Sequence, residues 1–273
     1  MTTTVHTLEP RNAGATTGFV ASTSTITRRA ALRYARTPQL IVMATLQMAL
    51  FFLIYRYMFG GAIHAGSLPY VDYLVPGFIA TGVLFSGIGA AVAIAEDVEQ
   101  GFVDRLRSLP IPRSSVLAAR VLADTAILAL SAAVTVAIAF AVGFRLHGSA
   151  LQALAAFGLV VVFGFAFEWL FVTMGLFAGS GQAAQGMGMI VFPLAFVSSA
   201  YVTVASMPGW LQVFAKYQPL TYMVDAVRGL TLGSRAQIEL GHPSSYYIAR
   251  SLIWATAIFA VSVPLAVAKY QRG

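Results

Sequence analysis

Residues 151–178 read LQALAAFGLVVVFGFAFEWLFVTMGLFA, and Glu168 is the only charged residue in this stretch. A helix that crosses a lipid bilayer needs about 20 consecutive apolar residues, so this stretch is long enough to cross one. The rest of the chain is similar, since 58% of its 273 residues are hydrophobic and 10% are charged. Soluble domains carry about 25% charged residues. The composition therefore excludes a cytosolic enzyme and a disordered chain, and it predicts an integral membrane protein.

Six apolar runs of membrane-spanning length predict an all-α membrane protein with six transmembrane helices. Besides Leu151–Ala178, the runs are about Leu40–Phe59, Tyr73–Ala95, Val116–Phe144, Ala183–Ala205 and Tyr247–Ala268. An even number of spans puts both termini on one side. With both termini inside, 11 of the 17 Lys and Arg residues lie on the cytoplasmic side and 6 lie outside. We therefore predict a multi-pass protein of the cell membrane with cytoplasmic termini.

The region before the first span divides into two parts. Residues 1–23, in a segment rich in Thr, Ser, Ala and Gly, are predicted to be a disordered cytoplasmic tail, and residues 38–273 form the six-helix domain. Between them, residues 24–37 place Arg29, Arg33 and Arg36 on one helical face. This pattern fits an interfacial amphipathic helix bound to anionic lipids, and it equally fits a plain positive cluster that sets topology. The net charge of +7 indicates an excess of Lys and Arg on the cytoplasmic side of the membrane rather than nucleic-acid binding.

The predicted cytoplasmic link after the second span, residues 96–115, reads EDVEQGFVDRLRSLPIPRSS. Its apolar residues recur at helical spacing and predict a short amphipathic helix. Acidic residues would occupy the N-terminal turn and basic residues the C-terminal end, as the helix dipole favours, before two prolines end the helix. The helix is either a surface-lying connector or a docking site for a soluble motor protein.

The predicted external loop, residues 206–246, contains two short half-apolar helices over Trp210–Tyr217 and Leu220–Leu232. Pro219 separates them and Gly233 ends the second. We predict a re-entrant hairpin in the outer leaflet rather than a small external cap. The candidate residues of this hairpin are Trp210, Pro219, Asp225 and Arg228.

Two segments resemble the ABC type-2 exporter permeases, most closely the daunorubicin-resistance subgroup. One is residues 96–113, with the core DRLRSLPIPR from Asp104, and the other is residues 218–230, QPLTYMVDAVRGL, before the last span. The resemblance implies a permease that dimerises with a second copy, and two copies of a cytosolic ABC ATPase. It also implies that the loop after the second span is the coupling helix that contacts the ATPase. The coupling residues would be Glu96, Asp97, Glu99, Gly101, Phe102, Asp104, Arg105, Leu106, Arg107 and Pro110.

The chain itself has no motif for binding nucleotide. A P-loop needs a lysine directly after a glycine, and the two lysines, Lys216 and Lys269, both follow alanine. We therefore expect no enzyme activity and no cofactor here, with ATP and Mg²⁺ bound by the partner ATPase. There is no cysteine, and the four histidines lack metal-site spacing, so no metal site is expected. No histidine lies in a predicted span, which argues against an intramembrane serine protease.

Glu168 is the charge that most needs explaining, because a charge at the bilayer centre costs at least about 2.5–3.5 kcal/mol. It is a candidate for the substrate pathway, but a packed polar contact or an ion pair with another span would also explain it. Arg120 and Asp124, four residues apart in the third span, favour a local structural pair.

The leading hypothesis is the permease subunit of an ATP-driven exporter for a hydrophobic or amphipathic substrate, such as a drug, a polyketide or a lipid. A polysaccharide or glycolipid export permease is the alternative of the same fold. An ATP-independent membrane assembly factor is the alternative of a different class.

We predict that charge reversal at Asp104 and Arg105 will abolish complex formation with the ATPase, or its stimulated ATP hydrolysis. Membrane insertion should stay intact, because the loop lies outside the predicted spans. Copurification and ATPase assays test this, and unchanged coupling in the reversed variant would argue against the exporter hypothesis.

Overall fold

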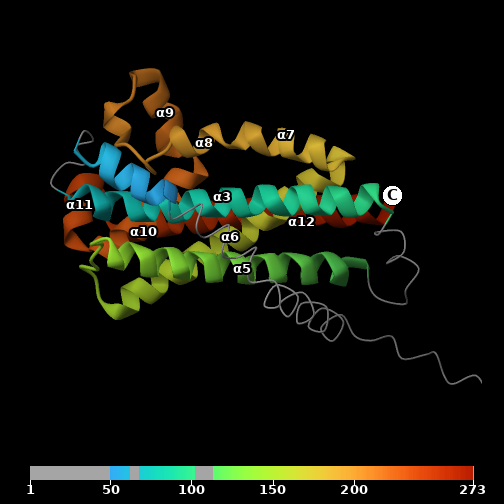
Figure 1. Cartoon of the computed structure of the whole chain (residues 1–273), viewed down its shortest axis with the longest axis horizontal. Coiled ribbons are helices and arrows are strands. Elements are labelled where there is room, and N and C mark those ends of the chain that lie inside the picture. The colour runs from blue at the N-terminus through green and yellow to red at the C-terminus, as the bar shows by residue number, and fades with distance from the viewer. Residues whose placement is uncertain (1–49, 62–67, 102–112, 273) are drawn as a thin grey trace, which may run out of the picture.

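The computed structural model describes residues 50–61, 68–101 and 113–272, and these ranges contain helices but no strand. Four of the helices are long and apolar enough to cross a membrane. They are α3 (Tyr70–Glu99), α5 (Arg113–Ala141), α6 (Ala150–Ala178) and α12 (Ser244–Arg272). They confirm the all-helical fold and the membrane-length helices predicted at the second, third, fourth and sixth positions. Figure 1 shows α3, α5 and α12 running along the long axis of the molecule.

Helix α6 is the centre of the bundle, since it packs against α3, α5, α7, α10 and α12. Both of its ends follow from local sequence. At the start, the Ser149 hydroxyl accepts a hydrogen bond from the Gln152 amide, and the Gln152 side chain accepts one from the Ser149 amide. This reciprocal arrangement is a capping box. At the end, Gly179 has φ +78°, a left-handed conformation that favours glycine.

Only part of the first predicted span lies in the described residues, as an apolar helix over Leu50–Phe59. Two of its aromatic side chains pack inward: the Tyr55 ring lies 4.7 Å from the Tyr201 ring, and the Phe52 ring lies 5.4 Å from the Phe78 ring. The predicted tail over residues 1–23 and the interfacial helix with Arg29, Arg33 and Arg36 lie outside the described residues.

The prediction of one continuous fifth helix over Ala183–Ala205 is wrong. The segment forms α7 (Gly181–Val191) and α8 (Pro193–Phe196), followed by non-helical backbone and a short 3₁₀ turn, η2 (Val204–Ser206). The break falls at Pro193, which has no N–H to donate and whose ring clashes with the preceding turn. The eleven residues of α7 span about 16 Å, roughly half of the hydrocarbon core. Six spans therefore remain a prediction.

Three further helices gather at one end of the bundle (Figure 1), and we call this the hairpin end. They are α9 (Gly209–Tyr217), α10 (Pro219–Leu232) and α11 (Ser234–Leu240). The two predicted hairpin helices are thus confirmed as helices, with Pro219 at the start of α10 and Gly233 after its end. We call the opposite end of the bundle the C-terminal end, because the chain ends there. At this end α3 and α12 finish and α5 and α7 begin.

The two hairpin helices differ in burial. Trp210 on α9 is 76% exposed, whereas every residue of α10 from Leu220 to Leu232 is buried. Helix α10 packs against α3, α6 and α12. It therefore enters the bundle, which fits a re-entrant hairpin better than an external cap.

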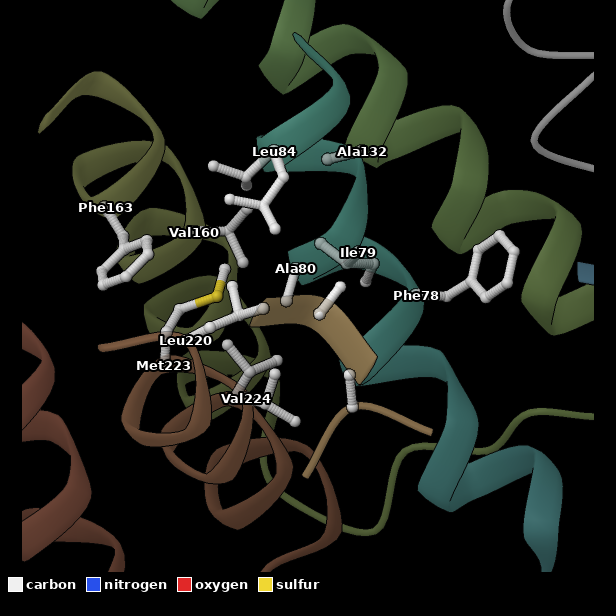
Figure 2. Close-up of a cluster of buried hydrophobic side chains, with 14 of the residues drawn as sticks. Phe78, Ile79, Ala80, Leu84, Ala132, Val160, Phe163, Leu220, Met223 and Val224 are labelled. Atoms are coloured by element: carbon white, nitrogen blue, oxygen red, sulfur yellow. The ribbon is translucent and has the colours of Figure 1, made fainter. Parts of the chain in front are cut away.

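The core lies where α10 meets α3 and α6. Figure 2 shows buried apolar side chains of these helices packed together, with Ala132 from α5. The labelled members are Phe78, Ile79, Ala80, Leu84, Ala132, Val160, Phe163, Leu220, Met223 and Val224.

The non-helical segment after α8 lies against α3. A Cβ atom added at Gly77 would lie 1.9 Å from the carbonyl oxygen of Ala200, so only glycine fits there. By contrast, a Cβ added at Gly89, twelve residues later in the same helix, would meet nothing within 4 Å.

We therefore predict that Gly77→Ala will destabilise the protein by about 1–3 kcal/mol or more, because the added methyl group collides with backbone. Gly89→Ala is the matched control, and it should be neutral or stabilise by up to about 1 kcal/mol through helix propensity. Thermal unfolding of the detergent-solubilised variants measures both effects. Equal melting temperatures for the two variants would contradict the close approach of Gly77 to Ala200.

Candidate functional site

The acidic residues predicted to begin the coupling helix instead end α3. Glu96, Asp97 and Glu99 lie in its last turn, and Gly101 follows with φ +67°. The prediction that they occupy the N-terminal turn of a separate helix is wrong, because α3 continues through Ala95 without a break. Negative charge at a helix C-terminus is unfavourable to the helix dipole, so these carboxylates need other partners.

Arg120 of α5 is the first of these partners. Its Nη1 atom lies 2.6 Å from Asp97 Oδ2, and its Nε atom lies 3.1 Å from Asp124 Oδ2. The pair with Asp124 confirms the local pair predicted from the sequence. The bond to Asp97 was not predicted, because nothing in the local sequence joins residues 23 positions apart. Arg120 therefore ties the end of α3 to the start of α5.

The N-terminus of α7 is the second partner. The Gly181 amide, at the first residue of α7, donates a hydrogen bond of 3.3 Å to Glu99 Oε2. A carboxylate is favourable at a helix N-terminus, where amide groups lack partners within the helix. Glu96 also reaches this point, since its Cγ atom would lie 2.8 Å from a Cβ added at Gly181. The acidic turn of α3 thus contacts both α5 and α7.

The rest of the predicted coupling segment lies outside the described residues. This applies to Phe102, Asp104, Arg105, Leu106, Arg107 and Pro110. The structure places the two anchors of the segment at the C-terminal end: the acidic turn of α3 precedes it, and Arg113 begins α5 directly after it.

Glu168 lies inside the bundle, between α6 and α3. Its side chain has no exposed surface, and the Ser86 hydroxyl donates a hydrogen bond of 2.7 Å to its Oε1 atom. Its Oε2 atom has no hydrogen-bond partner among the described residues. This contact fits a packed polar interaction within one subunit. The role of Glu168 in a substrate pathway stays a prediction.

The hairpin residues Asp225 and Arg228 form a buried ion pair, with Arg228 Nη1 lying 2.7 Å from Asp225 Oδ1. The Ser199 hydroxyl donates to the same carboxylate oxygen at 2.7 Å. Burial raises the pKa of the Asp225 carboxyl, while Arg228 and the Ser199 hydroxyl oppose that shift by favouring the ionised form. The pair sits on α10, and its i to i+3 spacing was visible in the sequence.

Arg228 also holds the non-helical segment in place. Its Nη2 atom donates to the carbonyl oxygens of Tyr73, at 3.0 Å, and Ser199, at 2.9 Å. Its guanidinium carbon lies 3.7 Å from the centre of the Tyr73 ring, which is a cation–π contact. The Tyr73 hydroxyl in turn donates to the Ser199 carbonyl at 2.9 Å. One guanidinium therefore joins α3, α10 and the chain between α8 and α9.

The hairpin end also contains a cavity of about 560 Å³ beside this ion pair. Its lining includes Asp225 and Arg228, together with several tyrosines of α9, α10 and α12. The sequence pattern gave no indication of this cavity, because its lining comes from segments that are distant along the chain.

Residues 21–232 match the family described as ABC-2 type transporter. The chain belongs to this family. The permease is 29% identical over 254 residues to the daunorubicin resistance ABC transporter permease protein DrrB1 of Streptomyces coeruleorubidus, covering 93% of this chain and 87% of that protein. It is 27% identical over 256 residues to the probable doxorubicin resistance ABC transporter permease protein DrrC of Mycobacterium tuberculosis, covering 93% and 90%.

These findings confirm the resemblance to the drug-resistance subgroup of permeases. The matched region includes the acidic turn of α3, the undescribed residues 102–112 and all of α10. The two relatives are permease proteins by name, which agrees with a membrane subunit rather than an ATPase.

We predict that Arg228→Met will destabilise the permease by about 3–5 kcal/mol, because it leaves Asp225 as an uncompensated buried charge. The loss should shrink as the pH falls, since protonation of Asp225 removes that charge. Arg235→Met is the control, at an exposed arginine on the neighbouring α11 whose Nη1 atom lies 2.8 Å from His147 Nε2, and it should change stability by about 1 kcal/mol or less. Thermal unfolding at several pH values measures this. A small, pH-independent loss at Arg228 would contradict the proposed clamp.

Proposed function

We propose that this permease is the membrane subunit of an ATP-driven exporter that moves a hydrophobic or amphipathic substrate, such as a drug, a polyketide or a lipid, out of the cytoplasm or the inner leaflet. Family membership and the names of the drug-resistance relatives support this substrate class. The transporter would contain two permease copies and two copies of a cytosolic ABC ATPase, which binds ATP and Mg²⁺. It would lie in the cell membrane with both permease termini in the cytoplasm.

The observation that carries the proposal is the double tie at the end of α3. If the termini are cytoplasmic, the C-terminal end of the bundle faces the ATPase, and residues 102–112 form the contact. A force on that loop reaches α5 through Asp97 and Arg120, and it reaches α7 through Glu99 and Gly181. Charge-assisted hydrogen bonds such as the short Arg120–Asp97 contact constrain both the distance and the direction between two helices, and the longer Gly181–Glu99 bond adds a second connection.

Helix α7 would carry the movement toward the hairpin end. It packs against α3 and α6, and it is followed by the break at Pro193. A proline break removes a backbone hydrogen bond and is a common place for a helix to bend. The segment beyond the break includes Ser199, whose carbonyl oxygen accepts a hydrogen bond from Arg228. ATP binding would thus change the geometry at the hairpin end through one continuous piece of chain.

The remaining predicted residues have supporting roles in this proposal. Arg29, Arg33 and Arg36 would hold the chain at anionic lipids of the inner leaflet. Glu168 would meet substrate only in a conformation that breaks its contact with Ser86.

We predict that Arg120→Met will lower transport and substrate-stimulated ATP hydrolysis by about 5- to 150-fold, the usual range for loss of a coupling free energy. The ATPase should still copurify, because residues 102–112 are unchanged. Asp97→Asn removes the negative charge from the same tie with almost no change of shape, and it should have an effect of the same sign and smaller size. Lys269→Met is the matched control, because it also removes a positive charge at this end of the bundle. The Lys269 ammonium lies over the Phe177 ring rather than at the tie, so coupling should stay normal in this variant.

Two results would overturn the proposal. Normal coupling in both Arg120→Met and Asp97→Asn would show that the tie carries no coupling. Failure of the unaltered permease to copurify with any ABC ATPase would favour the ATP-independent assembly factor.

A further inference from the structure

The cavity at the hairpin end has the size and position of a ligand site. Its volume of about 560 Å³ lies within the range of about 300–1,000 Å³ that is usual for small-molecule pockets. It is bounded by α9, α10, the start of α12 and the chain around Thr203. The acidic turn that couples to the ATPase lies at the opposite end of α3, so the cavity is separate from the coupling site.

Aromatic rings form one wall of the cavity. The Tyr246 ring lies 6.3 Å from the Tyr222 ring, 5.3 Å from the Tyr247 ring and 4.5 Å from the His242 ring. Tyrosine rings offer a flat apolar face together with a polar hydroxyl. Such a wall suits a ring that has an apolar face and also carries polar groups.

The buried ion pair of Asp225 and Arg228 also lines the cavity. Asp225 Oδ1 accepts hydrogen bonds from Arg228 and Ser199, but within the part of the chain that the structure describes no hydrogen bond reaches Asp225 Oδ2. Thr203 and Thr221, which carry hydroxyl groups, also line the cavity. The cavity therefore combines an available carboxylate acceptor with hydroxyl groups that both donate and accept.

The charges of the cavity nearly balance. Arg228 is compensated by Asp225, and Lys216 adds one positive charge to the lining. A cationic ligand would meet Lys216 without a free counter-charge. A pure hydrocarbon would displace water from Asp225 and the threonines. The hydrogen bonds that these groups make to water would then be lost without replacement, which costs free energy. A neutral ring with several hydroxyl groups satisfies both the aromatic wall and the polar wall.

We propose that this cavity binds a hydroxylated ring, such as a sugar ring, carried on an apolar group. The inference rests on the proposed function, because it assigns to the exporter a substrate class: amphipathic molecules with a hydroxylated ring. The ring could belong to a glycolipid headgroup or to a water-soluble glycoside, and the two sources share the same contacts with the cavity.

A single-cysteine experiment tests the proposal, because the chain has no cysteine of its own. Ala205→Cys places a thiol in the lining of the cavity, and Ser234→Cys places one on α11 outside the lining. Both positions are exposed. Each permease variant is placed in phosphatidylcholine nanodiscs without the ATPase, and its labelling by a membrane-impermeant maleimide is timed.

Octyl β-D-glucoside, kept below its micelle concentration, should slow labelling of the Ala205→Cys thiol about tenfold at about ten times its dissociation constant. It should leave the Ser234→Cys thiol unaffected, and 1-octanol, which has the tail without the ring, should protect neither. Equal slowing at both thiols, or equal protection by octanol and the glucoside, would overturn the proposal. This comparison needs no change to the aromatic wall, so it decides the question even if wall variants do not fold.

A wall variant then tests the contact itself. Tyr246→Ala, in the Ala205→Cys background, should raise the dissociation constant of the glucoside about tenfold through loss of stacking. Tyr57→Ala, at an exposed tyrosine that is not part of the lining, is the matched control and should have no effect. An unchanged dissociation constant in a folded Tyr246→Ala variant would overturn the assignment of the wall.

The source of the ring is resolved by two further ligands. Protection by a glucosyl diacylglycerol in the nanodisc assigns a lipid headgroup, and protection by phenyl β-D-glucoside added in water assigns a soluble glycoside. Protection by neither overturns the proposal. Because labelling needs no ATPase, failure of coupling in the Arg120 and Asp97 variants and failure of ligand binding are distinguishable results.

Discussion

Residues 198–203 are non-helical, and residues 198–201 are buried in the bundle, so the polar groups of this backbone need partners there. Inside a membrane such backbone is tolerated only where protein or enclosed water satisfies it. Arg228 satisfies one of these groups, the Ser199 carbonyl, and its planar group donates in several directions at once. It reaches the Ser199 carbonyl, the Tyr73 carbonyl and the Asp225 carboxylate. Arg228 therefore connects α10, α3 and the non-helical segment at the hairpin end.

The first consequence concerns α10. Since Arg228 must reach the interior, the helix that carries it must be buried, and α10 is buried from Leu220 to Leu232. The start of α10 contributes to the same task, because the Gln218 side chain donates to the carbonyls of Leu194 and Val197. The second consequence concerns α3, which must approach the segment closely enough that Gly77 has no room for a side chain. The burial of α10 and the conformation of the non-helical segment after α8 therefore depend on each other.

The sequence predicted the features that depend on neighbouring residues. Helix α6 begins and ends within a residue of the predicted limits, because Ser149 and Gly179 act locally. The fifth span was mispredicted because hydropathy counts apolar residues and ignores the hydrogen bond that Pro193 cannot make. The acidic turn was misplaced because a carboxylate at Glu99 suits a helix N-terminus, and that N-terminus belongs to α7. The partners of Arg228 lie as far as 155 residues away and leave no local signal.

The coupling end and the proposed ligand cavity share one element. Helix α7 begins at Gly181 against Glu99, and the chain that follows it supplies Ser199 and Thr203 to the cavity lining. Because a helix is stiff along its axis, a shift at its start is passed to the break at Pro193 rather than absorbed within α7. We infer that a change at residues 102–112 would alter the cavity through this path. Linkage then requires the reverse effect, so a bound ring would change the affinity of the loop for its ATPase by the same factor.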